Sequence, residues 1–279
     1  MKPLTDQQKE WAQDWLVRGP LRPVAHMALM AMLNLELATH ALMSRTRAPD
    51  ISLSDVTIVI KTFERPKRCQ ALIRSIRRLY PQLPIIVVDD SLHPARFEGV
   101  KNITLPFDSG VSAGRNAGLA AVQTPYFVNL DDDIIFYRKT LLSDALSLLQ
   151  NHPEIDIMGG EVIDLPLYIS HDFRCGMIHP TDALPVLPSG TRIGILEVHD
   201  KVASNIFIAR TDSVRKVGWD PKVKRLDHAD FYTRAKGRLT SVHNPELQAL
   251  HVRNPFNAAY LDFRLDLEED YAYLRRKYY

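Results

Sequence analysis

From residue 55 onward, apolar runs of strand length alternate with segments that have helical periodicity. Residues 56–60 and 85–88 are continuous apolar runs rich in β-branched side chains, which is typical of strands covered on both faces. Residues 66–79 and 111–122 carry apolar positions at helical spacing, and further strands are expected at 103–105 and 126–130. This alternation predicts an α/β fold with a mostly parallel sheet and right-handed crossovers.

The chain before this pattern reads differently. Residues 24–43 are very apolar and approach the length of a membrane span, but polar side chains, Glu36 among them, interrupt the run. Because a Glu near the centre of a bilayer helix is costly, we expect a helix that packs against the main domain, a partner or a membrane surface. Residues 4–18 predict a short polar helix, residues 45–50 a linker, and no segment has the order of a secretory signal.

These shifts divide the chain into three parts: a helical extension at 1–50, a main domain at 51–255 and a tail at 256–279. The tail reads as one amphipathic helix over 260–279 with a basic, aromatic end, which could rest on an anionic membrane or simply place cations at the negative helix pole. Residues 165–200 are irregular and rich in Pro and Gly, which favours a binding loop.

Composition limits the function classes. With 279 residues, 46% of them hydrophobic and 24% charged, the chain can bury a full core. A net charge of +2 argues against a general nucleic-acid binder. The two cysteines, Cys69 and Cys175, match no zinc spacing, so a reducing compartment is expected, although a disulfide between them stays open.

Polar clusters follow three of the predicted strands. Residues 62–65 follow the first strand, Asp89 and Asp90 the second, and the triplet Asp131, Asp132 and Asp133 the fourth. In wound sheets, ligands bind outside the carboxyl ends of the strands. The sequence therefore predicts one ligand site at this edge.

The Asp triplet carries the most specific chemistry. Three adjacent carboxylates repel one another, and a divalent cation relieves that repulsion. In an extended segment Asp131 and Asp133 share a face while Asp132 points away. A solvated acidic turn is the alternative.

A glycine-punctuated helix start at 109–118 adds a second signal. Free backbone N–H groups and the positive helix pole favour a phosphate, and Arg115 could supply a charge to the same anion. The segment matches neither the dinucleotide fingerprint nor the P-loop, so a tight turn with a surface arginine remains the alternative.

These blocks together resemble the nucleotide-sugar half of the family 2 inverting glycosyltransferases of the GT-A fold, a Rossmann-like sheet flanked by helices. The likeness is closer to the animal ganglioside β-1,4-N-acetylgalactosaminyltransferases. It continues through Gly159 and Gly160, through 205–212 and through 217–221 to 228–231, and it covers about residues 54–253.

The resemblance implies roles for individual residues. Asp133 would bind Mn²⁺, or Mg²⁺, directly, Asp131 would meet the ribose or the metal, and His251 would complete the metal shell. The residues implied to bind a UDP-sugar are Thr62, Phe63, Glu64, Arg65, Asp89, Asp90, Arg115, Asn116, Asp131 and Asp132.

An inverting transfer also needs a base for the acceptor hydroxyl. The segment 227–231 is the candidate, but many relatives carry Glu-Asp where this chain has Asp227 and His228. Because residues three apart share a helix face, Asp227 and Asp230 are expected to point together while His228 points elsewhere. Asp230 or His228 is expected to be the base, with Asp227 binding the acceptor. An acidic cluster that only stabilises the helix dipole is the alternative.

The sequence thus predicts metal-dependent, inverting transfer of a sugar, with N-acetylgalactosamine as the first expectation, from a UDP-sugar to a saccharide or glycolipid acceptor. Polysaccharide or lipooligosaccharide synthesis in the cytoplasm, with peripheral contact to the inner membrane face, would suit it, and the Met- and Leu-rich run could be a homo-oligomer face. A sugar-phosphate nucleotidyltransferase is one alternative, although residues 61–66 lack the expected glycines. A noncatalytic nucleotide-sugar-binding module is the other.

Overall fold

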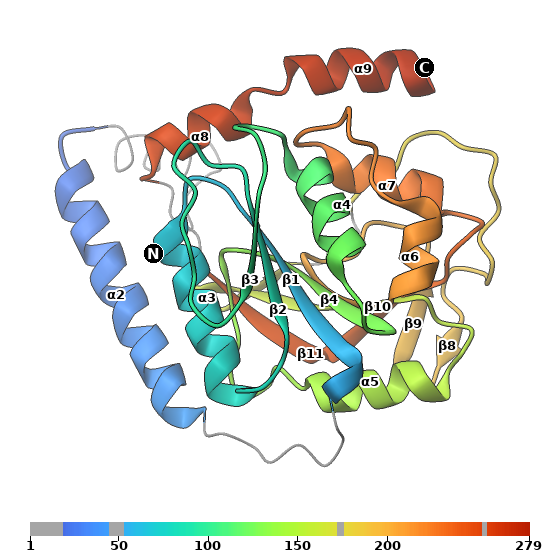
Figure 1. Cartoon of the computed structure of the whole chain (residues 1–279), viewed down its shortest axis with the longest axis horizontal. Helices are drawn as coiled ribbons and strands as arrows, with labels where there is room; N and C mark the ends of the chain where they lie inside the picture. Colours follow the sequence, from blue (N-terminus) through green and yellow to red (C-terminus); the bar gives the residue numbers. More distant parts are fainter. Residues whose placement is uncertain (1–18, 45–52, 172–175, 253–255) are drawn as a thin grey trace, which may run out of the picture.

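The computed structural model describes residues 19–44, 53–171, 176–252 and 256–279. They form one large mixed sheet with helices on both faces, further helices along one edge, and helix α2 (Arg22–Met43) at one side (Figure 1). The strand order is β3-β2-β1-β4-β10-β6-β11-β9-β8. The predicted α/β class and the mostly parallel sheet are confirmed.

The nucleotide-binding half predicted from sequence is present as four parallel strands. These are β1 (Val56–Thr62), β2 (Ile85–Asp89), β3 (Lys101–Thr104) and β4 (Tyr126–Asp131). Strand β1 is buried along its whole length, and its neighbouring residues Ile58 and Val59 enter different core clusters on the two faces of the sheet. The strand therefore lacks a polar face because it has no solvent face.

The second half of the sheet continues in mixed order. Strand β10 (Ile206–Arg210) runs antiparallel to both β4 and β6 (Ile157–Leu165), and β11 (Ser241–Val252) pairs parallel to β6. Strands β6 and β11 therefore point the same way as β4, so all these carboxyl ends meet at one edge. Short strands complete the sheet: β5 (Ile134–Ile135), β7 (Ile169–His171), β8 (Arg192–Ile193) and β9 (Leu196–His199).

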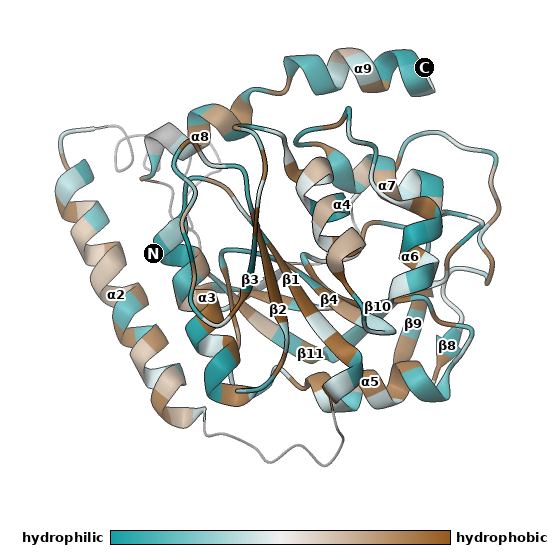
Figure 2. Cartoon of the chain, in the orientation of Figure 1, coloured by the Kyte–Doolittle hydropathy of each residue, from teal (hydrophilic) through white to brown (hydrophobic). Residues whose placement is uncertain are grey.

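Helices cover the sheet on both faces. The helices α3 (Pro66–Leu79) and α5 (Leu142–Asn151) pack in one core cluster, and α4 (Val111–Ala121), α6 (Thr211–Val217) and α7 (Asp227–Ala235) pack in the other. A short 3-10 helix, η1 (Leu53–Asp55), leads into β1. The hydropathy colouring agrees with this burial: β1 and β2 are mostly brown, whereas helices such as α3 and α9 carry teal as well (Figure 2).

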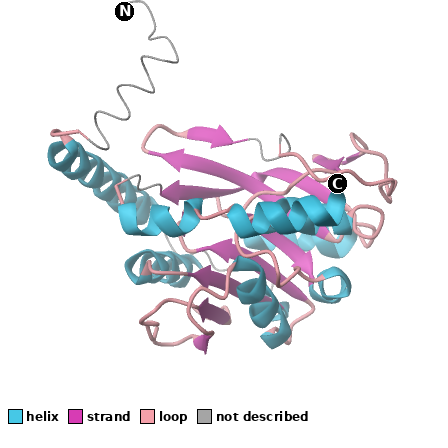
Figure 3. Ribbon diagram, turned by 90° about the horizontal axis from the view of Figure 1, so that it is seen from above, coloured by secondary structure: helices cyan, strands magenta, loops and turns pink. Residues whose placement is uncertain are grey.

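The tail corrects one expectation. Instead of a single helix over 260–279, the structure has α8 (Ala258–Leu265) and α9 (Glu268–Tyr278), which lie one after the other along the carboxyl edge of the sheet (Figure 3). The break follows from two separate attachments. Phe263 of α8 packs against Phe63 and Phe107, whereas Asp270 of α9 accepts hydrogen bonds from the backbone of residues 224–226.

Helix α2 packs by one face against the β11 side of the molecule. Leu33 is 1% exposed in a small cluster with Tyr137 and Leu250, while Leu35 and Leu42 are 70% and 82% exposed. In the parts of the chain that the structure describes, no helix combines the length and hydrophobicity that crossing a bilayer requires. The predicted helix at 4–18, the linker at 45–50 and Cys175 lie outside the described residues, and the domain boundaries near 50 and 255 stay predictions because they fall in or beside such segments. Cys69 is buried and free.

Close contact between α4 and the sheet depends on Gly118. A Cβ placed there would lie 2.4 Å from Cγ1 of Val59 and 3.3 Å from Cγ2 of Val88. We expect Gly118→Ala to lower the free energy of unfolding by about 1–3 kcal/mol through overpacking. Urea denaturation measures this change. A gain of up to about 1 kcal/mol, the ordinary effect of alanine in a helix, would contradict the packing argument.

Candidate active site

A cavity of ≈ 220 Å³, called the edge cavity below, opens where the carboxyl ends of β1, β4 and β11 meet. Its wall brings together residues that the sequence had placed on different strands and helices. They include Phe63, Arg65, Asp90, Arg115, Asp131, Asp133, Asp227, His228 and His251. Parallel strands and a long-range pairing between β5 and β11 produce this convergence.

The Asp triplet is split between the cavity and the interior. Asp131 and Asp133 line the edge cavity, whereas Asp132 is fully buried. Asp132 accepts a 2.6 Å hydrogen bond from Thr62 Oγ1 and pairs with Arg65, which also donates to Asp133 at 2.9 Å. The burial of Asp132 raises its pKa to about 6, even though Arg65 opposes that rise.

His251 lies between two carboxylates. Its Nδ1 is 2.6 Å from Oδ1 of Asp164, and its Nε2 is 3.3 Å from Oδ2 of Asp133. Burial would lower the pKa of His251, but the hydrogen bonds and charges of Asp133 and Asp164 raise it to about 9. A carboxylate behind the ring fixes its orientation, as it does in many metal sites.

These side chains fit a divalent cation. Oδ1 of Asp133 is buried without a hydrogen-bond partner among the described residues, next to an imidazole nitrogen on the same wall. Within the described ranges, no three acidic, His or Cys side chains are gathered closely enough to enclose a metal by themselves. A cation here would therefore share its ligands with water and with a bound phosphate, as Mg²⁺ sites commonly do.

Arg115 joins the two halves of the cavity. Its guanidinium is only 2% exposed, lies 3.0 Å from Asp131 and forms an ion pair with Asp227. Burial alone would lower the pKa of Arg115, but the two carboxylates raise it, so the group carries its charge inside the protein. Arg115 thus fixes the start of α7 relative to the end of β4.

The first turn of α7 does not present the face expected from spacing. Asp227 and His228 line the edge cavity, whereas Asp230 is 1% exposed and lies outside its lining. Asp230 accepts hydrogen bonds from Arg234 Nε at 2.8 Å and Tyr278 Oη at 2.7 Å and pairs with Lys277 of α9. The expectation that Asp227 and Asp230 share a functional face while His228 points elsewhere is wrong: His228 lines the cavity with Asp227, and α9 covers the side of the helix that carries Asp230.

Several other residues implied by the resemblance serve local structure. Asp89 accepts hydrogen bonds from the backbone N–H of Ser91 and Ala95 at 2.9 and 3.0 Å, and Asn116 bonds both the backbone N–H and the carbonyl of Trp219. Neither residue lines the edge cavity, and neither does Thr62. Asp90 does, where it pairs with Lys61.

Glu64 does not line the edge cavity. It lines an adjoining cavity of ≈ 650 Å³, called the side cavity, between α2, α3 and α8. The side cavity shares Arg65, Asp133, His251, Tyr260 and Arg264 with the edge cavity.

Sequence reasoning missed the contribution of the tail to this site. Tyr260, Phe263 and Arg264 of α8 all line the edge cavity, and the Arg65 guanidinium lies 4.0 Å from the centre of the Tyr260 ring. Lys61, Asn205 and Arg225 are further lining residues. The three- and four-residue spacing of Tyr260, Phe263 and Arg264 marks a helix face, but their sequence does not indicate which surface they cover.

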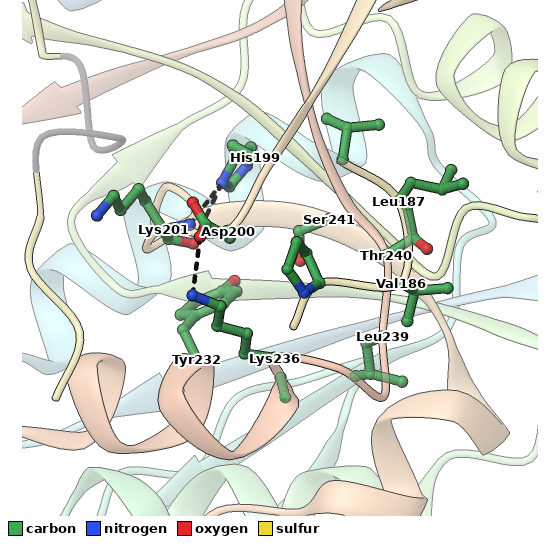
Figure 4. Close-up of a pocket in the computed structure, with 13 residues that line it drawn as sticks. Val186, Leu187, His199, Asp200, Lys201, Tyr232, Lys236, Leu239, Thr240 and Ser241 are labelled. Carbon is green, nitrogen blue, oxygen red and sulfur yellow. Dashed lines mark hydrogen bonds and ion pairs between the residues drawn. The ribbon is translucent and has the colours of Figure 1, made fainter. Parts of the chain in front are cut away.

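A third cavity lies away from this chemistry. It holds only ≈ 20 Å³, about the space of one water molecule, between α7 and residues 185–201. An ion pair of 3.0 Å between Asp200 and Lys236 closes one side of it (Figure 4). The cavity is therefore a packing gap under the irregular stretch and is too small for a sugar.

The chain is similar to a known protein family and to curated proteins. The family model "Glycosyl transferase family 2" matches residues 57–164. Human beta-1,4 N-acetylgalactosaminyltransferase 1 is 36% identical over 197 residues, which is 66% of this chain and 36% of that protein. Mouse beta-1,4 N-acetylgalactosaminyltransferase 2 is 34% identical over 212 residues, 72% of this chain and 40% of that protein. The chain therefore spans well under half the length of these relatives.

Solved structures support the same fold. S. aureus TarS 1–349 in complex with UDP superposes with a TM-score of 0.54 at 15% identity, covering 72% of this chain and 61% of that one. The same protein in complex with UDP-GlcNAc gives a TM-score of 0.55 at 16% identity, covering 72% and 59%. Residues 57–164 form a family 2 glycosyltransferase domain, and the sheet and helices built around it have the GT-A fold.

Proposed function

We propose that this protein is a metal-dependent, inverting glycosyltransferase that moves an N-acetylhexosamine from its UDP derivative to a saccharide hydroxyl. The observation that carries the proposal is the meeting of three pairs in one cavity: Arg115 with Asp131, Asp133 with His251, and Asp227 with His228. The first pair suits a nucleotide, the second a cation and the third an acceptor.

The donor would lie along the β1 and β4 side of the edge cavity. Phe63 and Lys61 offer a ring face and a cation near the end of β1, and Asp131 offers an acceptor for a ribose hydroxyl. The relatives are named for transfer of N-acetylgalactosamine, and TarS was crystallised with UDP-GlcNAc. Both names support a UDP-N-acetylhexosamine, and N-acetylgalactosamine remains our first donor.

Asp133 and His251 would hold the cation, with Mn²⁺ favoured by the mixed oxygen and nitrogen donors. When bound, a divalent ion neutralises the charge that develops on the leaving diphosphate. Arg65 pairs with both Asp132 and Asp133, so its positive charge offsets part of the negative charge at this edge.

The base proposed here is His228, with Asp227 as its neighbour on the cavity wall. Asp227 is committed to Arg115, whereas His228 is half-buried and faces the cavity, so its neutral imidazole can accept a proton. The acceptor oxygen attacks the anomeric carbon, the bond from that carbon to the diphosphate breaks, and UDP leaves on the opposite side. The hydroxyl proton passes to the imidazole, so atoms and charges balance.

The acceptor would bind over α7 and the stretch 176–201, which the sequence predicted to be irregular but which contains the short strands β8 and β9. This stretch packs on α7: the backbone N–H of His179 donates to Thr233 Oγ1 at 2.8 Å, and a Cβ at Gly237 would lie 2.8 Å from the Leu184 carbonyl.

Contact with an inner membrane face and formation of a homo-oligomer stay predictions from the sequence.

The assay that tests the proposal measures products from UDP-N-acetylgalactosamine and UDP-N-acetylglucosamine with Mn²⁺ and with excess chelator. We expect metal-dependent release of UDP, which increases when a saccharide acceptor is added. Release of pyrophosphate from a sugar phosphate and UTP would instead support a nucleotidyltransferase. Binding of UDP-sugar without turnover for any acceptor would support a binding module.

A further inference from the structure

Helix α9 begins with three acidic residues, of which only one is buried. Glu268 and Glu269 are exposed, but Asp270 is 3% exposed. The Asp270 carboxylate accepts hydrogen bonds from three consecutive backbone N–H groups, at 2.9 Å from Lys224, 2.7 Å from Arg225 and 2.8 Å from Leu226. Hydrogen bonds to an ionised acceptor are about twice as strong as neutral ones.

The segment that Asp270 holds leads directly into α7. This helix begins at Asp227, and its N-cap residue Leu226 offers no side-chain capping bond. The N-terminal N–H groups of a helix need acceptors, and a carboxylate there also opposes the positive pole. Asp270, 44 residues further along the chain, places a carboxylate at this end: it accepts from the N–H of the N-cap residue Leu226 and from the two N–H groups that precede it.

The same segment is part of the edge-cavity wall. Lys224 and Arg225 line the cavity, and Asp227 and His228 follow them on the same wall. On its other side the segment touches α4: the Lys224 carbonyl accepts a 2.7 Å hydrogen bond from Val111, next to Gly110. A Cβ at Gly110 would lie 2.7 Å from the Lys224 Cα, so the segment has no room to shift toward α4.

We propose that Asp270 is a positioning residue for the transfer: it fixes residues 224–226 and thereby sets where His228 and Asp227 stand relative to the donor. The proposal rests on the function proposed above. Asp270 does not line the edge cavity and acts only through the backbone that it holds. The far end of α9 holds the same helix a second time, through Lys277 and Tyr278 on Asp230.

The test compares Asp270→Asn with Glu268→Gln, which removes an exposed acid from the same helical turn. UDP binding by calorimetry gives the number of competent sites, and initial rates give kcat per site. We expect Asp270→Asn to lower kcat per UDP-binding site by about 10–100-fold, because displacement of catalytic groups by about 1 Å costs that much. Its UDP affinity should stay close to wild type, and Glu268→Gln should match wild type in both measurements.

A purely structural role would change different quantities. It would lower the melting temperature and the number of UDP-binding sites but leave kcat per site unchanged, and that result would overturn the proposal. Asp270→Glu, which keeps the charge and lengthens the side chain, gives the same readout if the Asn variant does not fold. Loss of UDP binding in both Asp270 variants would also overturn the proposal. A wild-type protein that releases no UDP would instead refute the proposed function itself.

Discussion

Replacement of Asp133 by asparagine is expected to lower metal-dependent turnover by about a thousandfold, since losing several kcal/mol of charge stabilisation by the metal corresponds to a factor of that size. Asp133 combines a buried oxygen without a hydrogen-bond partner among the described residues with an imidazole at 3.3 Å. An asparagine keeps the shape of the side chain but offers one neutral oxygen.

The fold should survive this change. Arg65 loses one of its two carboxylate partners but keeps Asp132, so no buried charge is left without an opposite charge. The measurement is the rate of UDP release as a function of Mn²⁺ concentration, together with the Mn²⁺ dependence of UDP binding. Asp144→Asn, an exposed acid in the first turn of α5, is the control. Wild-type rate and metal dependence in the Asp133 variant would remove the metal assignment.

Substitution of His228 by glutamine is expected to lower kcat by about 10²–10⁴-fold, the usual contribution of a general base. UDP affinity should hardly change, because the groups proposed to bind the donor lie on the β1 and β4 side of the cavity. His93→Gln, in an exposed loop, is the matched control. Unchanged kcat in the His228 variant would exclude the imidazole as base and leave Asp227.

The pH dependence separates these two bases further. Burial lowers the pKa of His228, with the Asp227 charge opposing and the Arg115 charge adding to that effect. The base must be neutral to accept a proton, so kcat should be constant at neutral pH and fall as pH falls through a midpoint below 6.5. The glutamine variant should lose this acid limb. An acid limb that persists in the variant would point to a carboxylate.

The activity of an Asp227 variant is harder to interpret than that of a His228 variant. It forms a buried ion pair with Arg115, and each partner is only 2% exposed. Removing one side of a buried pair costs about 3–5 kcal/mol when the remaining charge has no other partner. Arg115 would keep Asp131, at 3.0 Å and 24% exposed, so the expected loss of stability is smaller than that but not zero. Loss of activity in an Asp227 variant would therefore mix lost chemistry with lost stability, so thermal unfolding must accompany the rate measurement.

The secondary structure near the donor side was predictable because local patterns decide it. The helix predicted at 66–79 coincides with α3, and the strands predicted at 56–60 and 126–130 lie inside β1 and β4. Continuous apolar runs and helical spacing show which side chains are removed from water, and proline and glycine mark the ends of the strands and helices. The same logic placed Asp131 and Asp133 at the carboxyl edge, where both now line the cavity.

The predictions from sequence failed where a segment far away in the chain covers the side chain concerned, or where a nearby group offers it a partner. The spacing of Asp227 and Asp230 predicted a common functional face, but Lys277 and Tyr278, 47 and 48 residues away, bind Asp230 on the far side. Asp132 turned inward because Thr62 and Arg65 offered it partners, and Asp89 turned to the loop that follows its own strand.

The sequence by itself determined the order of strands and helices over residues 56–130, the edge where acidic groups gather and the residue types available there. Periodicity carries that information, since burial of a strand or a helix face is a local property of the chain. Only the tertiary structure decided which of those side chains face the cavity, and that α8 and α9 complete and brace its wall. Each buried polar group must find a partner, and which partner is nearest depends on segments that meet only when the whole chain has packed.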